Sequence, residues 1–379
     1  MIKKKPNWGS KALAAKVASD NVTTKPADPA KPVRKPFNLK GTELEEIHNS
    51  IKASRGEEIA VLGRRKLNYP RIPTGIFAMD LALAGGFLSS RGHMVYGERS
   101  AGKSTTSLRA AVNAQAIYPD SVIGYMDVEG TFDPSYFEKL GGDMERLYHV
   151  EPESGEHAVD IGDALCRTKE ISVLITDSIA MLVPMKEIES SAEDAMMGVH
   201  ARMIGAYLRR ITNAMIHERH RGHRITAIHL NQFRMKIGLV FGDPRSLPGG
   251  KALEFSTSQQ VEIKNKELQN SAGQVVRNEH EFKITKDKTG GRFKTGKFFV
   301  VREPKENNGY PEGTIIQAGS ILEMASQIGL SPDKKELIGF GKERGKDAWQ
   351  ERFVKDPELL FRVQEKVIGA YRDLWGIEM

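Results

Sequence analysis

The segment HMVYGERSAGKSTTSLRAAVNAQA, residues 93–116, decides the fold of this chain. Its centre, GERSAGKS at 97–104, has the spacing G-x-x-x-x-G-K-[ST]. An apolar, strand-like run precedes it and a helix-like run follows it, which is the context that this pattern requires. The glycines let backbone N–H groups turn towards phosphate oxygens, and the helix N-terminus adds its dipole. The segment therefore predicts a nucleoside triphosphate site.

Short apolar runs that end in polar or glycine residues alternate with segments of helical length. The expected strands are residues 93–97, 122–129, 173–178 and 226–232, and the expected helices are residues 107–118, 156–167 and 196–216. This alternation is typical of repeated βαβ units, so we predict an α/β fold with a mainly parallel sheet flanked by helices. Ligands of such sheets collect beyond the carboxyl ends of the strands. We therefore expect the polar strand ends to converge on one rim.

Strand-like patterns also dominate the chain from about residue 255. Residues 259–265, 279–288 and 297–303 predict further strands of the same sheet. Residues 41–60 show a modest helical pattern, with Leu44, Ile47 and Ile51 on one stripe. We expect four parts: a basic tail at 1–40, a short helical segment at 41–70, a nucleotide-binding core at 71–315 and a small, mostly helical domain at 316–379.

The charge of the chain is concentrated in its first 40 residues. The whole sequence carries a formal net charge of +7. Residues 1–40 hold ten Lys and Arg against two Asp, which leaves 46 basic and 47 acidic groups in the remainder. A tail rich in Lys, Pro and Ala cannot repay its ordering entropy, so we expect disorder. Its role would be solubility or weak attraction to phosphates, and a transit peptide is disfavoured because its cations are nearly all Lys.

The remaining composition favours a cytoplasmic protein. Hydrophobic residues make up 39% of the chain and charged residues 28%, which fits a globular protein with a proper core. No stretch approaches the ~20 apolar residues that span a bilayer, and the N-terminus lacks an apolar signal core. Cys166 is the single cysteine, which excludes an internal disulfide and a cysteine metal cluster and favours a reducing compartment.

Side chains with the chemistry of phosphoryl transfer stand at the expected rim. Lys103 would supply charge at the β- and γ-phosphates, and Ser104 would offer its hydroxyl to Mg²⁺. Asp177 ends an apolar strand, where a carboxylate can hold Mg²⁺ through water. Glu129 ends another strand and suits a base or water-positioning role near the γ-phosphate. Two aspartates within the same stretch, residues 127–133, compete for that role.

The strand that ends at Gln232 continues into FRMKIGLVFGDPRSLPGG, residues 233–250. This connection is longer than the ~12–15 residues beyond which loops become uncommon in compact domains, and such loops are usually functional. It starts beside the nucleotide site, so γ-phosphate contact at Gln232 would order or release it. Single-strand binding combines cations with apolar or aromatic platforms, and the candidates are Arg234, Lys236 and Arg245 for the first and Met235, Ile237 and Phe241 for the second. A solvated charge run, with Phe241 in the core, is the alternative.

The cluster HERHRGHR, residues 217–224, contains three histidines and invites a metal site. It follows an expected helix and precedes an expected strand, and only Glu218 adds a further ligand at suitable spacing. We interpret the cluster as a solvated basic turn, near duplex DNA if it binds anything.

Together these residues resemble the bacterial-type RecA family of homologous-recombination ATPases. The match runs from IPTGIFAMDLALAGG (72–86) to about Gly296, and more loosely through the C-terminal part. Its most specific piece is NQFRMKIGLVFGDP (231–244) with GGKALEF following, a string not expected in a generic P-loop ATPase. GERSAGKS and DVEGTFDPSYFEKLG (127–141) are similar to the family's nucleotide motifs, in the same order.

The resemblance implies ATP and Mg²⁺ as cofactors. The nucleotide-binding residues would be Gly97, Glu98, Arg99, Ser100, Ala101, Gly102, Lys103, Ser104, Thr105, Asp133, Tyr136 and Asp177. Of these, Asp133 and Tyr136 would lie beside the adenine, and Ser104 and Asp177 would serve Mg²⁺. The catalytic residues would be Glu129, Lys103, Gln232, Lys286 and Lys288. Gln232 would relay the presence of the γ-phosphate, and the last two lysines would reach the ATP of a neighbouring protomer.

The resemblance also implies two DNA-binding loops, around residues 187–198 and 233–250. The residues expected at DNA are Met197, Gly198, Arg202, Arg234, Met235, Lys236, Ile237, Arg245, Gly249 and Gly250. Residues 41–70 would then serve polymerisation, and residues 71–315 would be the ATPase and DNA-binding core. Since the family works as a helical filament on single-stranded DNA and pairs it with a homologous duplex, both DNA forms and further copies of the chain are the expected partners. No membrane is expected.

Several residues depart from the family pattern. DPRSLPGG (243–250) is more basic than usual, Gly130 replaces a larger residue, Glu254 replaces a basic residue beside Phe255, and the N-terminal tail is unusually basic. These differences favour a divergent member of viral or plasmid origin, which would place it in a host cytoplasm. They leave the core chemistry untouched.

We therefore expect a DNA-dependent ATPase that forms filaments on single-stranded DNA and promotes homologous pairing and strand exchange. Two other functions share the same ATPase core: a ring-shaped hexameric DNA helicase and a non-catalytic scaffold that coats single-stranded DNA. A helicase function does not explain the string NQFRMKIG. The expected catalytic residues Glu129, Lys286 and Lys288 argue against a scaffold that does not hydrolyse ATP.

Overall fold

The computed structural model describes residues 40–55, 70–189, 198–235, 245–288 and 295–375. Its centre is an eight-stranded sheet in the order β12-β11-β10-β3-β7-β6-β4-β5. These strands are β3 (Gly92–Gly97), β4 (Val122–Asp127), β5 (Leu147–Val150), β6 (Ile171–Asp177), β7 (Thr226–Gln232), β10 (Thr257–Gln269), β11 (Val275–Asp287) and β12 (Thr295–Val301). Neighbours from β10 to β5 are parallel, whereas β11 and β12 are antiparallel additions at one edge. The predicted mainly parallel sheet, extended by later strands, is confirmed.

The described residues also form helices and short strands outside this sheet. The helices are α2 (Glu43–Arg55), α3 (Phe77–Ala82), α4 (Lys103–Ile117), α5 (Pro134–Lys139), α6 (Gly155–Arg167), α7 (Met185–Glu189), α8 (Val199–His220), α9 (Gly250–Ser256), α10 (Gln317–Gln327), α11 (Lys346–Lys355) and α12 (Pro357–Trp375). The short strands are β1 (Arg71–Ile72), β2 (Phe87–Leu88), β8 (Arg234–Met235), β9 (Arg245–Ser246), β13 (Glu336–Leu337) and β14 (Gly341–Lys342).

The carboxyl ends of the central strands meet along one rim. Gly97 at the end of β3 pairs with Gln232 at the end of β7, and Asp127 at the end of β4 pairs with Asp177 at the end of β6. Parallel strands joined by crossover helices bring equivalent ends to the same edge. The register therefore confirms the expected convergence of polar strand ends.

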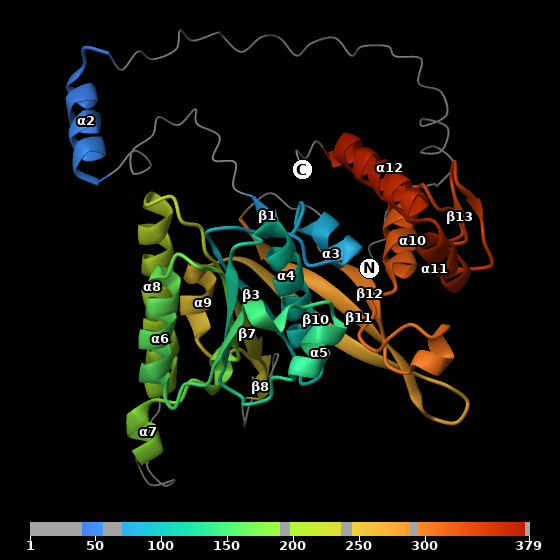
Figure 1. Ribbon diagram of the computed structural model, residues 1–379, viewed down its shortest axis with the longest axis horizontal. Coiled ribbons are helices and arrows are strands. Elements are labelled where there is room, and N and C mark those ends of the chain that lie inside the picture. The colour runs from blue at the N-terminus through green and yellow to red at the C-terminus, as the bar shows by residue number, and fades with distance from the viewer. Residues whose placement is uncertain (1–39, 56–69, 190–197, 236–244, 289–294, 376–379) are drawn as a thin grey trace, which may run out of the picture.

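Alternating strand side chains divide the core into two layers. On β3, Val95 belongs to the larger apolar cluster, whereas Met94 and Tyr96 belong to a second cluster on the other face. Residues of α3, α4, α5 and α10 complete the first cluster, and residues of α6, α8 and α9 complete the second. Figure 1 shows α6 and α8 running side by side at one end of the molecule, with α10, α11 and α12 gathered at the other.

The chain after β12 packs against the antiparallel edge of the sheet. The helix α10 contacts α3 and β12, and α11 contributes the buried side chains of Trp349 and Phe353 to the larger cluster. The indole Nε1 of Trp349 donates to Lys335 O at 2.6 Å. The expected helical character of this region is confirmed, and its division from the core at residue 316 stays a prediction.

Some elements differ from the expected ones. The helix α8 continues to His220, so the first half of the HERHRGHR cluster is helical and not part of a turn. The short edge strand β5 was not predicted, because its four residues, two half-buried at the ends and two exposed between them, show no alternation. The segment 233–250, expected to be a loop, contains the paired strands β8 and β9 and ends where α9 begins. Most of the tail at 1–40 lies outside the described residues.

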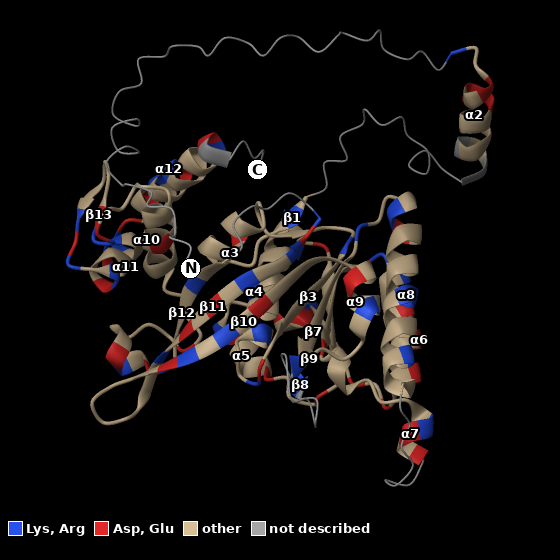
Figure 2. Ribbon diagram, turned by 180° about the vertical axis from the view of Figure 1, so that it is seen from behind, with Lys and Arg blue, Asp and Glu red and all other residues tan. Residues whose placement is uncertain are grey.

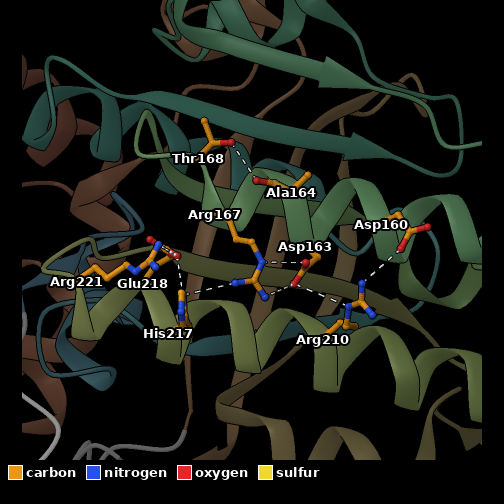
Figure 3. A network of polar contacts seen from close by, with 9 residues as sticks. All are labelled: Asp160, Asp163, Ala164, Arg167, Thr168, Arg210, His217, Glu218 and Arg221. Carbon is orange, nitrogen blue, oxygen red and sulfur yellow. Dashed lines mark hydrogen bonds and ion pairs between the residues drawn. The ribbon is translucent and has the colours of Figure 1, made fainter. Parts of the chain in front are cut away.

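A chain of ion pairs joins the outer faces of α6 and α8 (Figure 3). Arg167 donates Nε to Asp163 Oδ2 at 2.9 Å and a second N–H to Oδ1 at 3.0 Å. Arg210 of α8 reaches both Asp163 and Asp160, at 3.9 and 3.6 Å. The side chain of Asp163 is only 15% exposed, whereas that of Asp160 is 74% exposed. Asp163 is therefore the more buried of the two carboxylates, and it holds Arg167 of its own helix as well as Arg210 of α8.

We expect Asp163→Ala to lower the free energy of unfolding by about 1 kcal/mol, because it removes a bidentate pair and the link to α8. Asp160→Ala is the matched control, and it should change the free energy by less than ~0.5 kcal/mol because its single contact is long and exposed. Urea denaturation followed by circular dichroism measures both. Equal losses for the two variants would contradict this assignment.

Candidate functional site

The turn between β3 and α4 forms an anion-binding loop. Ser100 and Gly102 have positive φ angles of 58° and 92°, which turn the backbone so that α4 begins at Lys103. The free N–H groups and the dipole of this helix end favour an anion such as phosphate. Lys103 Nζ donates to Glu98 O at 2.8 Å, and burial lowers the pKa of this lysine. The loop thus holds its own cation beside the helix end.

Strand β11 braces this loop from behind. A Cβ added at Gly102 would lie 2.8 Å from Cε1 of His280, so the close approach requires glycine. His280 Nδ1 lies 2.8 Å from Ala101 O, and its ring stacks on Phe298 with centroids 4.7 Å apart. Burial lowers the pKa of His280 to about 4, so the neutral ring donates to the carbonyl from Nδ1 at ordinary pH. The phosphate loop therefore rests on a fixed aromatic support.

Asp177 at the end of β6 meets the start of α4. Its Oδ2 accepts hydrogen bonds from Ser104 Oγ at 2.7 Å and Tyr125 OH at 2.8 Å. Burial raises the pKa of the Asp177 carboxyl, while these two hydrogen bonds and Lys103 act in the opposite direction. A hydroxyl and a carboxylate at this place are oxygen ligands of the kind that Mg²⁺ takes together with water and phosphate oxygens. The pair therefore fits a Mg²⁺ ion.

Glu129 lies two residues beyond β4 and connects that strand to β6 and β7. Its Oε1 accepts hydrogen bonds from Ser178 Oγ and from Gln232 Nε2, both at 2.5 Å. Asp127 shapes the turn by accepting from the backbone N–H groups of Glu129 and Phe132, at 3.2 and 2.8 Å. A half-buried carboxylate fixed at this rim can orient a water molecule or accept a proton.

A cavity of about 550 Å³ opens beside the phosphate loop. Residues 100–105, Asp133 and Tyr136 line one side of it, and Tyr136 OH lies 2.9 Å from Thr105 Oγ1. Asn265, Asn278 and Arg302, from β10, β11 and the end of β12, line the other side. The structure thus brings together the expected nucleotide-binding residues from 100 to 136. Gly97, Glu98 and Arg99 form the start of the same loop without lining the cavity.

Several residues at this site were not predicted. Tyr125 and Ser178 contact the two carboxylates of the rim, and His280, Asn278 and Arg302 come from strands far along the chain. Strand alternation could have placed Tyr125, since it lies two positions before Asp127 on the same strand. No local pattern marks the others, because the pairing of β10, β11 and β12 decides which of their side chains face the cavity.

The segment 233–250 contains β8 and β9, which we call its first and second arm, and the two arms pair with each other next to Gln232. Arg234 pairs with Ser246 and Met235 pairs with Arg245 in the β8–β9 ladder. Asn231 Nδ2 donates to Pro248 O at 3.0 Å, which ties the second arm to the end of β7. Arg234 also donates to Ala180 O at 2.7 Å. The cations at the two ends of this segment are therefore held in the protein's own contacts.

The other expected DNA-binding residues are only partly described. Gly198 caps α8 with φ 82°, and Arg202 is exposed on the first turn of that helix. Gly249, with φ 93°, caps α9, whose first residue is Gly250. Only the backbone of Met235 is described. Met197, Lys236 and Ile237, with Phe241, lie outside the described residues.

Lys286 and Lys288 lie at the end of β11, near α9 of the same chain. Lys286 Nζ donates to the carbonyl oxygens of Glu254 and Thr257, and burial lowers the pKa of this lysine. Lys288 N donates to Ser258 O at 3.0 Å. Their reach to a neighbouring nucleotide stays a prediction.

The histidine cluster at 217–224 does not form a metal site among the described residues. Glu218 is buried and lies 2.9 Å from His217 Nδ1 and 3.7 Å from Arg221 (Figure 3). Within the described ranges, the group of His and carboxylates whose ligand atoms lie within 4.8 Å of one another is Asp127, His149 and Glu151.

Among the residues that the structure describes, no helix combines the length and the apolar character needed to cross a membrane.

Comparisons with known proteins agree with the geometry. The family model described as the RecA N-terminal domain matches residues 42–303. The chain is 33% identical to Protein RecA of Bifidobacterium breve over 363 residues, which cover 92% of this chain and 87% of that protein. It is 34% identical to Protein RecA of Amycolatopsis mediterranei strain U-32 over 81% of this chain and 86% of that protein. For Protein RecA of Mycobacterium sp. strain KMS the identity is 35%, over 79% and 84% of the two chains. The chain belongs to the RecA family.

Proposed function

We propose that this protein is a DNA-dependent ATPase that forms helical filaments on single-stranded DNA and promotes homologous pairing and strand exchange in the cytoplasm. The hydrogen bond between Gln232 and Glu129 carries the proposal, since it joins a nucleotide site to the root of a segment suited to DNA. A protein that only binds a nucleotide does not need this hydrogen bond. A protein whose ATP hydrolysis depends on DNA needs a contact of this kind between its two binding sites.

ATP would lie along the cavity with its phosphates on the loop at 97–105. Lys103 and the N–H groups of α4 would neutralise the β- and γ-phosphates, and Mg²⁺ held by Ser104 and Asp177 would add charge neutralisation when bound. Glu129, oriented by Ser178, would position the attacking water. Phosphoryl transfer needs little covalent help from the protein, so positioning and electrostatics supply most of the rate.

The sugar and base of ATP would reach the far side of the same cavity. Asp133 and Tyr136 would flank the base on one side, and the later strands would close the other. Lys286 and Lys288 would complete the site of a neighbouring protomer, which makes hydrolysis depend on filament formation.

DNA would bind beyond the rim, on the side of α7, α8 and the β8–β9 arms. The proposed contacts are Met197, Gly198, Arg202, Arg234, Met235, Lys236, Ile237, Gly249 and Gly250. Backbone phosphates would be neutralised by the cations, and apolar side chains would separate or support the bases.

The rate of ATP hydrolysis with and without single-stranded DNA, together with electron microscopy of the products, tests the function. We expect DNA to stimulate hydrolysis at least tenfold and extended filaments to appear on the DNA, because the DNA segment and the nucleotide site are physically joined. Closed rings that unwind duplexes would favour a helicase. Filaments that bind ATP without turnover would favour a scaffold.

Glu129→Gln should lower kcat for ATP hydrolysis by about 10²–10⁴-fold, the usual contribution of a general base or water-positioning group. Binding of single-stranded DNA with ATP should persist, because the amide keeps the shape of the side chain. Glu138→Gln, an exposed change on α5, is the control and should hydrolyse ATP at the normal rate. Undiminished turnover in Glu129→Gln would remove Glu129 from its proposed role.

Gln232→Ala should uncouple ATP from DNA. We expect the gain in single-stranded DNA affinity caused by ATP to fall by about fivefold or more, within the usual range of coupling between two sites. Fluorescence anisotropy of a labelled oligonucleotide, with and without a non-hydrolysable ATP analogue, measures that gain. Gln274→Ala, whose side chain is exposed and contacts Glu303, provides the control. An unchanged ATP dependence would refute the relay.

A further inference from the structure

Arg245, expected to contact DNA, lies in a cluster of side chains under the β8–β9 arms. Its guanidinium carbon lies 4.8 Å from the centroid of the Phe233 ring, and one of its nitrogens lies 3.7 Å from Glu262 Oε1. The Phe233 ring in turn packs edge-on against Tyr96, with centroids 5.5 Å apart. We call Arg245, Phe233 and Glu262 the clasp.

The clasp joins three elements that are distant in sequence. Phe233 follows directly after Gln232 at the end of β7, Arg245 begins β9, and Glu262 lies on β10 of the central sheet. The side chains of Arg245 and Glu262 are 32% and 13% exposed, so their attraction is less screened than that of a surface pair. A cation over an aromatic ring adds about 0.5–2 kcal/mol depending on burial. The arrangement therefore holds the second arm of the segment against both the sheet and the residue next to Gln232.

These contacts conflict with a simple phosphate-binding role for Arg245. The charge of this guanidinium is already offset by Glu262 and one of its faces is covered by the Phe233 ring, so less of it is left for a phosphate. Among the described residues, Arg202 has no such ion pair or ring contact, and it stands exposed on the first turn of α8. The two arginines therefore suit different tasks, Arg202 at the DNA and Arg245 within the protein.

We propose that Arg245 is a positioning residue that couples the nucleotide site to the DNA-binding segment through the clasp, and that it is not itself a DNA ligand. This proposal rests on the proposed function. Gln232 contacts Glu129, and its neighbour Phe233 contacts Arg245, so a change at the rim passes to the far arm through two side-chain contacts. Glu262 anchors the outer end of this path on a sheet strand.

The test compares Arg245→Ala, Glu262→Gln and the charge swap R245E/E262R. Single-stranded DNA affinity is measured with and without a non-hydrolysable ATP analogue, over a range of salt concentrations. We expect each single variant to lower the ATP-induced gain in affinity by about five- to tenfold, within the range of site-to-site coupling, with an unchanged salt slope. We expect the charge swap to recover the gain to within about twofold of the original protein, since the ion pair is restored in reverse.

A direct DNA contact by Arg245 makes opposite predictions. Arg245→Ala would then reduce the salt slope by about one, because one phosphate contact is lost. Glu262→Gln would raise DNA affinity by removing a nearby negative charge, and the charge swap would not recover binding. Any of these three results would overturn the proposal. Asp347→Asn is the matched control, because it also removes a carboxylate paired with an arginine, Arg277 at 2.7 Å, and changes the net charge equally.

A second measurement needs no DNA and separates failure of the clasp from failure of the proposed function. Hydrogen–deuterium exchange of the peptide that contains Ser246 should become at least about threefold faster in Arg245→Ala and in Glu262→Gln, because the second arm loses its anchor. Exchange should return towards the original rate in the charge swap. Unchanged exchange in both single variants would refute the clasp. If exchange becomes faster as expected in the single variants but the original protein does not bind DNA, the proposed function alone is refuted.

Discussion

The parallel register of β3, β7, β6 and β4 is the constraint on which the rest of this molecule depends. It puts Gly97 beside Gln232 and Asp127 beside Asp177, so the phosphate loop, the Asp177 carboxylate and the start of the segment 233–250 share one rim. A shift of one residue in any of these strands would turn every side chain to the opposite face. Such a shift is opposed by two separate apolar layers, because Val95 and its neighbours on either side belong to different clusters. Hydrophobic packing thus sets the position of the polar site.

The rim itself holds charges that are costly to bury. Lys103 and Asp177 are 6% and 4% exposed, and burial opposes the charged form of both. The protein offsets this cost with its own groups: Glu98 O for the lysine, and Ser104 and Tyr125 for the carboxylate. The same arrangement keeps each group in place before any ligand arrives, so little reorganisation is needed when a phosphate and a cation enter. Ser178 and Gln232 likewise hold the Glu129 carboxylate in place by donating hydrogen bonds to it.

Sequence patterns predicted the parts of the site that are local in the chain. The strand, glycine loop and helix around Lys103 are contiguous, and Asp177 and Glu129 stand at strand ends that apolar runs make visible. The wall formed by Asn278, His280 and Arg302 was not foreseen, because only the pairing of three late strands brings it to the phosphate loop. The same limit applies to Gly102, whose need for glycine comes partly from an imidazole 178 positions away in the chain. The prediction of a loop at 233–250 missed the paired strands β8 and β9, because two-residue strands are too short to leave a periodic signal.

The path from Glu129 at the rim to Arg245 in the second arm runs through only two residues, Gln232 and Phe233. Gln232 ends β7, which is buried in the sheet, and Phe233 follows it directly, so a movement of one backbone unit is passed to the next. Gln232 contacts Glu129 at the rim, while the Phe233 ring packs against Tyr96. Under the proposed coupling, a change in hydrogen bonding at Gln232 would displace the Phe233 ring. Figure 2 shows β8 and β9 side by side below β7. Because Arg245 lies over the Phe233 ring and also pairs with Glu262, such a displacement would either break the ion pair or move the second arm. Two discrete arrangements of Arg245 would then be enough to couple the two proposed sites, without a wider rearrangement of the sheet.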